Sequence, residues 1–202
     1  MKSMKRVFCI LAVVGLLLGG SQSALAQKRG EFLVKGGVGY LSVYDLLGSL
    51  VVGLGTAFSD EEANAESFVP MLNPNLSVYW GVTDKIAVGT SFSFGYSSAR
   101  RVVTETGAVC KSMKVFYPSL CFDVYTTYYR SGKFSFYGMY GVGPMLYMSE
   151  QTDEGVTTRK YELLPAGQLY PIGFSYGGKI SGFIEGGWGA KGLVNAGISC
   201  CF

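Results

Sequence analysis

Apolar residues alternate with small or polar residues along most of this chain, and the last nine residues show the pattern most clearly. At period two, one face of a strand would be apolar: Val194, Ala196, Ile198, Cys200 and Phe202. The opposite face would be small or polar: Asn195, Gly197, Ser199 and Cys201. Soluble domains usually finish in a polar, frayed tail. The pattern therefore predicts a terminal strand whose apolar face has an apolar environment.

Seven earlier segments show the same alternation, which gives eight predicted strands. They cover residues 31–44, 74–81, 86–96, 115–129, 134–147, 160–176 and 180–188, and residues 193–202 complete the set. In each clear case the apolar positions are predicted to face outward and the small or polar positions inward. Pro165 and Pro171 blur the period in the sixth segment.

A repeated turn connects these segments. Lys85, Lys133 and Lys179 each follow a tight-turn residue and precede an alternating strand, at spacings of 48 and 46 residues. A unit of two strands, one short turn and one longer connection is typical of an up-and-down meander. The longer polar connections are expected at 59–67, 97–111 and 149–159, whereas 189–192 is very short. Short turns on one side and long loops on the other are typical of outer-membrane barrels, with the short turns in the periplasm.

These features predict an all-β fold, an eight-stranded antiparallel up-and-down transmembrane β-barrel. Beyond the first 26 residues no apolar run reaches the ~18 residues of a spanning helix. Inside a bilayer only a closed barrel then satisfies the backbone polar groups. Aromatic residues near both strand ends also predict two interfacial girdles. One girdle includes Trp80, Tyr129, Phe134, Tyr176 and Phe202, and the other includes Tyr40, Tyr44, Phe94, Tyr147 and Trp188.

The first long connection contains an apolar segment at 45–52 that breaks the strand period. Asp45 is a candidate helix cap, and an acidic run at 60–62 follows. We interpret this segment as a short helix in the first extracellular loop. The alternative is an ordinary hydrophobic strand with a polar tip.

The N-terminus predicts export. Lys2, Lys5 and Arg6 precede an apolar run at 7–18, and Ala24-Leu25-Ala26 provides a small-x-small cleavage site. Residues 1–26 are therefore a predicted signal peptide, and residues 27–202 the barrel domain. Three of the 17 basic residues and none of the 14 acidic ones lie in the leader. The mature chain is formally neutral, so its charge gives no reason to expect a nucleic-acid partner.

The terminal strand carries a resemblance to a known signal. Asn195, Gly197, Cys200 and Phe202 resemble the terminal assembly signal of bacterial outer-membrane barrels, and the whole mature chain resembles small barrels of the OmpX, OmpW and OmpA-transmembrane type. The resemblance implies location in the outer membrane of a Gram-negative bacterium. It implies contacts with outer-membrane lipid, lipopolysaccharide and the barrel-assembly machinery, and it identifies no extracellular partner.

Candidate chemistry is limited by the absence of histidine. A hydroxyl nucleophile needs a base that titrates near neutrality, so we expect no enzymatic activity. We also expect no metal or cofactor, since the chain has no Cys-x-x-Cys motif and no phosphate loop. Asp123 and Glu185 are predicted to face the lumen and to form a polar network with Lys35. The four mature cysteines favour no particular disulfide: Cys110, Cys121, Cys200 and Cys201.

Two classes of function remain. The chain is either a structural or surface-interaction protein anchored by its barrel, or a porin-like passage protein for small hydrophobic solutes gated by the first loop. The interior of an eight-stranded barrel is only just wide enough for its own side chains. Inward glycines and serines opposite large polar residues therefore predict a closed lumen, which favours the first class.

Overall fold

Antiparallel β-strands make up nearly all of the described chain. The computed structural model describes residues 29–42, 65–70, 72–102, 109–153 and 156–202. The strands are β1 (Phe32–Tyr40), β2 (Ala65–Pro70), β3 (Leu72–Gly81), β4 (Ile86–Val102), β5 (Val109–Ser131), β6 (Phe134–Asp153), β7 (Val156–Gly177), β8 (Ile180–Gly189) and β9 (Val194–Cys201). Among these residues no helix is long and apolar enough to cross a membrane.

The strands close into a barrel. The pairing order is β1-β3-β4-β5-β6-β7-β8-β9, and β9 pairs back with β1. The short strand β2 pairs with residues 97–101 of β4, while β3 pairs with residues 87–93 of the same strand. β2 and β3 therefore occupy one position in the ring, and the predicted eight-stranded antiparallel barrel is confirmed.

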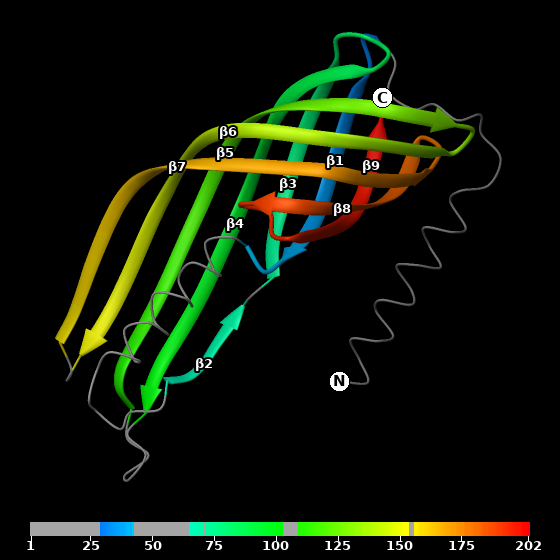
Figure 1. The fold of residues 1–202 in the computed structure, drawn as a ribbon. Coiled ribbons are helices and arrows are strands. Elements are labelled where there is room, and N and C mark those ends of the chain that lie inside the picture. Colours follow the sequence, from blue (N-terminus) through cyan, green and yellow to red (C-terminus); the bar gives the residue numbers. More distant parts are fainter. Residues whose placement is uncertain (1–28, 43–64, 71, 103–108, 154–155) are drawn as a thin grey trace.

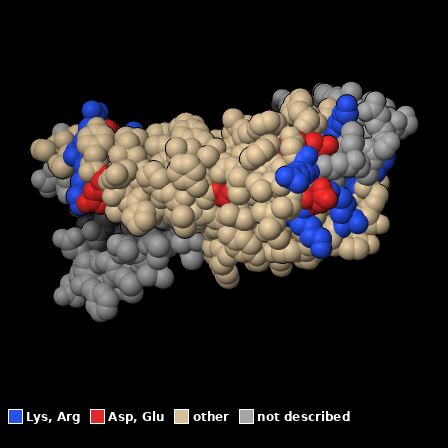
Figure 2. Space-filling model, turned by 90° about the horizontal axis from the view of Figure 1, so that it is seen from above, with Lys and Arg blue, Asp and Glu red and all other residues tan. Residues whose placement is uncertain are grey.

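The two faces of the barrel have the predicted polarity. Along β3, exposed and buried residues alternate at every position. Apolar side chains on the outside are exposed, for example Val78, Leu120, Val124 and Val142, whereas Ser77, Ser119 and Asp123 are buried inside. Figure 2 shows charged residues gathered at the two ends of the molecule, with a broad band between them that is almost free of charge. Such an exterior fits the hydrocarbon layer of a membrane.

One aromatic girdle lies at the end with the short turns. Its outward rings include Trp80, Tyr129, Phe134, Phe174, Tyr176 and Phe202. Neighbouring rings pack together, with centroids 5.2 Å apart for Phe136 and Phe174. At the other end Tyr40, Phe94 and Trp188 are exposed as expected. The prediction that Tyr147 belongs to this second girdle is wrong, because its side chain packs against the interior cluster around Tyr117 and Met145. Tyr44 lies outside the described residues.

The predicted long loops at 97–111 and 149–159 are wrong over most of their length. β4 continues to Val102 and β5 begins at Val109, while β6 ends at Asp153 and β7 begins at Val156. These extensions carry polar side chains on both faces, for instance Lys114 and Glu150 on one face and Ser149 and Lys160 on the other. Because neither face is consistently apolar, the period-two pattern that predicts a strand is lost.

The extended strands form a projecting wall, defined here as β2 with residues 97–102, 109–117, 145–153 and 156–167. β4 to β7 contain 17, 23, 20 and 22 residues, whereas β1, β3, β8 and β9 contain 9, 10, 10 and 8. A membrane-spanning strand needs only about 9–11 residues. At ~3.3 Å per residue the longest strands therefore continue for roughly 30–40 Å beyond the ring, and Figure 1 shows them projecting at its lower left.

Two predictions concern residues outside the described ranges. The signal peptide at 1–26 and the short helix at 45–52 both belong to them. Both stay predictions.

The facing of the strands can be tested with arginine. Val124 is exposed on the outside of β5, seven residues from the turn end of the strand. Val124→Arg would place a charge in hydrocarbon, so the free energy of unfolding in lipid vesicles should fall by roughly 2–4 kcal/mol. Urea titration followed by gel mobility measures the change. Thr157→Arg, on the exposed part of β7, is the matched control and should not shift the midpoint. Equal stability of the two variants would contradict the assignment.

Candidate functional site

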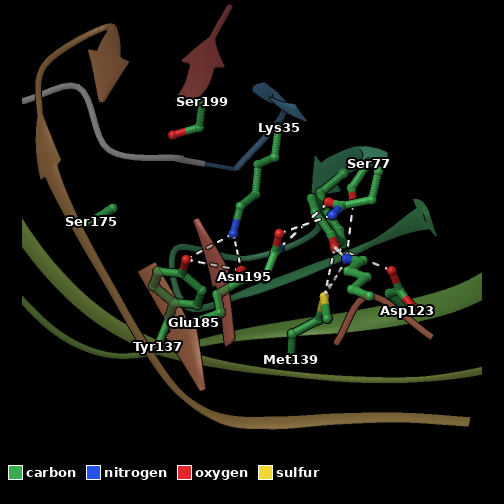
Figure 3. A network of polar contacts seen from close by, with 12 residues as sticks. Lys35, Ser77, Asp123, Tyr137, Met139, Ser175, Glu185, Asn195 and Ser199 are labelled. Atoms are coloured by element: carbon green, nitrogen blue, oxygen red, sulfur yellow. Dashed lines mark hydrogen bonds and ion pairs between the residues drawn. The ribbon is translucent and has the colours of Figure 1, made fainter. Parts of the chain in front are cut away.

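Lys35 and Glu185 form an ion pair in the middle of the lumen. Lys35 comes from β1 and Glu185 from β8, and both are almost fully buried. Tyr137 bridges the pair: its hydroxyl accepts a hydrogen bond from Lys35 Nζ at 2.8 Å and donates one to Glu185 Oε1 at 3.0 Å. Asn195 Nδ2 donates to the second carboxylate oxygen at 2.8 Å. Figure 3 shows these four side chains pointing toward one another from different strands.

Aromatic rings surround the Lys35 ammonium group. Its Nζ lies 4.1 Å from the ring centroid of Phe183, 4.4 Å from that of Tyr137 and 5.4 Å from that of Tyr125. The Tyr125 and Tyr137 rings stack with centroids 4.5 Å apart. Cation–π contacts of this kind stabilise a buried ammonium group when it has left water. The site is therefore dry, charged and closely packed.

Asp123 belongs to a second part of the network. Its side chain accepts hydrogen bonds from Tyr79 Oη at 3.1 Å and from Gln168 Nε2. Gln168 also donates to Ser91. The structure thus brings Lys35 together with Glu185, whereas Asp123 has a separate set of hydrogen-bond partners that includes Tyr79, Gln168 and Ser91.

Lys191 is a lumen residue that the sequence reasoning missed. Its Nζ donates to Ser77 Oγ at 3.0 Å and to Tyr79 Oη at 3.4 Å, and it contacts Met139 Sδ at 3.2 Å. Since Tyr79 in turn donates to Asp123, Tyr79 connects the second buried cation to the second buried anion. The signal in the sequence was the four-residue connection at 189–192, too short to form a loop like the others.

The turn at 189–192 folds inward, and glycine at position 39 makes this possible. All four turn residues are buried. A Cβ atom at Gly39 would lie 1.3 Å from the carbonyl oxygen of Lys191, so no other residue fits without moving the turn. Tyr170 Oη donates to the carbonyl oxygen of Gly192 at 2.5 Å and fixes the turn from β7. The turn therefore occupies part of the lumen at the end opposite the short turns.

Large side chains fill the rest of the lumen. The bulkiest fully buried residues are Tyr79, Tyr117, Tyr137, Tyr170, Lys191, Met139 and Met145. Glycine on the neighbouring strand makes room for a ring: Gly95 pairs with Tyr117, and a Cβ atom at Gly95 would lie 1.8 Å from the Tyr117 ring. A cavity at the short-turn end, lined in part by Tyr125, Lys133 and Ser199, has a volume of about 30 Å³. Such a volume holds about one water molecule.

The four residues of the terminal signal have separate places. Asn195 faces the lumen and bridges Glu185 and Asn75, with a distance of 2.9 Å from its Oδ1 to Asn75 Nδ2. Gly197 pairs with Gly37 and Phe183, and Cys200 lies between Val34 and Ile180. Phe202 is exposed, and its backbone exchanges hydrogen bonds of 3.0 and 2.8 Å with Phe32. Its role in assembly stays a prediction.

Thiol and metal chemistry have no organised site in the described part of the chain. Cys121, Cys200 and Cys201 are free, and the side chain of Cys110 lies outside the described set. Among the described residues no group of three or more Cys, Asp or Glu side chains is arranged to bind a metal ion.

Comparisons with known proteins concern the fold alone. No protein-family model and no curated protein matches the chain. Among solved structures it is similar to Ail, the attachment invasion locus protein of Yersinia pestis, with 12% identity, a TM-score of 0.46, and coverage of 86% of this chain and 95% of that one. It is also similar to the outer membrane protein OprG from Pseudomonas aeruginosa, with 13% identity, a TM-score of 0.45, and coverage of 89% and 99%.

The buried ion pair can be tested by removing one charge and then both. Glu185→Gln leaves the Lys35 charge without its counter-ion, so the free energy of unfolding should fall by about 3–5 kcal/mol. The double variant Lys35→Met/Glu185→Gln removes both charges and should recover most of that loss. Urea titration of the barrel in lipid vesicles measures both effects.

The exposed pair of Lys160 and Glu162 provides the control. Lys160→Met should leave the unfolding midpoint almost unchanged, because solvent screens an exposed pair. A Glu185→Gln variant as stable as the unmodified protein would show that the Lys35–Glu185 pair does not stabilise the barrel.

Proposed function

We propose that this chain is an integral outer-membrane barrel that acts as a non-catalytic anchor and presents its projecting wall for interactions at the cell surface. The wall is the observation that carries this proposal. Its strands continue well past the length a membrane requires, and residues 156–161 of β7 are exposed at every position. Strands of this length serve no purpose in the hydrocarbon layer, so we assign the extra length to contacts outside it.

The location is supported by three independent features. The barrel has an apolar exterior, the N-terminus has the pattern of an export signal, and an exposed aromatic residue, Phe202, follows β9. If the short turns at Lys85, Lys133 and Lys179 face the periplasm, as they do in outer-membrane barrels, the wall faces the cell exterior. Recognition by the barrel-assembly machinery through Asn195, Gly197, Cys200 and Phe202 is part of the same proposal.

The filled lumen argues against the alternative of passage for small hydrophobic solutes. An apolar solute would have to displace buried tyrosines and cross the Lys35–Glu185 pair, which is costly to separate. The inward turn with Lys191 obstructs the same route. The described residues therefore favour the anchor.

A groove on the outer face of the wall suits the proposed contact with outer-membrane lipid and lipopolysaccharide. It has a volume of about 470 Å³ and is lined by Tyr96, Lys114, Val115, Phe116, Met148, Ser149, Glu150, Arg159 and Tyr161. One row across the strands consists of Tyr96, Phe116, Met148 and Tyr161, and the three charged residues Lys114, Glu150 and Arg159 form a second row on the same face. An acyl chain fits the first row, and an anionic headgroup fits the two cations of the second.

The membrane location predicts a specific behaviour on gels. The unheated mature protein, extracted from outer membranes, should migrate differently from a boiled sample in SDS, because a closed barrel stays compact in detergent. Fractionation of cells provides the control. Recovery of the mature protein as a soluble periplasmic species would overturn the proposal.

The sealed lumen predicts electrical silence. Purified protein in planar bilayers should give no steady conductance. The double variant Tyr79→Ala/Tyr137→Ala serves as the positive control. It removes two of the largest buried side chains from the lumen and should raise the current. A steady current through the unmodified barrel would favour passage over anchoring.

A further inference from the structure

The upper part of β7 is an unprotected strand edge. Residues 156–166 pair with β6 on one side, and β8 begins to pair with β7 only at Gln168. Within the described chain no other strand pairs with this edge. The ladder with β6 is regular from Tyr170 to Val156, so no bulge turns the edge away. Long, regular edges of this kind are ready templates for another strand.

Side chains leave this edge accessible. Residues 156–161 and 163–165 are exposed, including Val156 at 69%, Tyr161 at 62% and Leu163 at 74%. Pro165 has no N–H group, so it sets the lower limit of a new ladder. Residues 156–164 lie above it, and a symmetric ladder centred near the middle of this segment can use about seven to nine of them, a normal length for a strand.

We propose that the β7 edge pairs antiparallel with the same edge of a second copy of this chain, with Tyr161 of each copy on the two-fold axis. This inference rests on the proposed surface-interaction function and names the partner. In a symmetric antiparallel pair, residues directly opposite each other point to the same face of the sheet. Since faces alternate along a strand, the residue numbers of two opposed residues must add to an even number, and the two-fold axis passes through one residue of each copy.

Charge selects the register. Lys160 and Glu162 lie on the same face, and they bond to each other at 2.5 Å within one chain. Centring the pair on Lys160 would oppose two lysines, and centring it on Glu162 would oppose two glutamates. Centring it on Tyr161 opposes Lys160 of each copy to Glu162 of the other, which gives two favourable cross-strand pairs. The hydrogen bond to Glu162 and the charge of that carboxylate raise the pKa of Lys160, so this lysine stays charged.

The geometry places the two copies in different membranes. From Gln168 onward β7 continues into the ring. An antiparallel ladder therefore puts the two rings at opposite ends of the paired segment. Copies in one membrane have the same orientation and cannot meet in this way. The pairing would join two facing outer membranes or two vesicles.

Charge reversal tests the pairing without relying on a single variant. Lipid vesicles that contain the unmodified barrel should cluster, as measured by light scattering. Vesicles with only Lys160→Glu, or only Glu162→Lys, should cluster at least about tenfold more slowly, because both cross-strand pairs become repulsive. A mixture of the two variant vesicles should cluster again, since each variant then supplies the charges that the other needs.

A cross-link tests the register. In a background with the four mature cysteines replaced by alanine, Tyr161→Cys should form a disulfide-linked dimer on oxidation. Thr157→Cys is the matched control and should not, because the two copies of this residue would lie roughly 27 Å apart along the ladder. Both variants must show the gel shift of a folded barrel.

The outcomes separate the two proposals. If barrels that are folded and electrically silent do not cluster, or if mixing the two variants fails to restore clustering, the homotypic pairing is wrong while the anchor function stands. If the barrels conduct a steady current, the anchor function itself fails. Cross-linking at Thr157 and not at Tyr161 would overturn the register.

Discussion

Closure of the backbone hydrogen-bond ladder is the constraint on which the rest of the structure depends. Inside hydrocarbon each unpaired N–H or C=O group costs several kcal/mol, so a sheet that crosses a membrane has to return to its first strand. Here the return is made by β9, which pairs with β1 over eight residues. Phe202 extends the same seam through two hydrogen bonds to Phe32. The apolar face of β9 points outward because this strand completes the outer surface of the ring.

Closing a ring of eight strands determines the width of the lumen, and the width determines its chemistry. A lumen this narrow is filled by side chains, so any charge within it is dehydrated. The described lumen buries two cations and two anions, which balance: Lys35, Lys191, Asp123 and Glu185. Tyrosine hydroxyls connect them, because a hydroxyl both donates and accepts. A uniformly apolar lumen would be simpler, but strands with two apolar faces would lose the alternation that sets their register.

The sequence could predict the ring because its two sides have different environments. Alternation along β3 follows directly from lipid on one face and packed side chains on the other. The projecting wall was mistaken for loops because water reaches both faces there, as the charges at Lys114 and Lys160 show. Lys191 was missed for another reason. Whether a glycine-flanked turn folds inward depends on the space beside Gly39, and that space exists only after β1 and β9 have paired.

Closure removes free strand edges from the ring, but the projecting wall has such an edge again. A barrel has no free edges, but a barrel whose strands differ in length has edges again above its shortest members. In this chain β8 ends at Gly189, so β7 loses its neighbour at Gln168 while its ladder with β6 continues to Val156. Outside the membrane, water can bind the unpaired N–H and C=O groups of the β7 edge. The edge therefore avoids the desolvation cost that requires a closed ring inside the membrane. Side-chain charge then decides which strand the edge can bind. Lys160 and Glu162 make the edge complementary to a second copy of itself in the register centred on Tyr161, and they oppose like charges in the registers centred on Lys160 and Glu162.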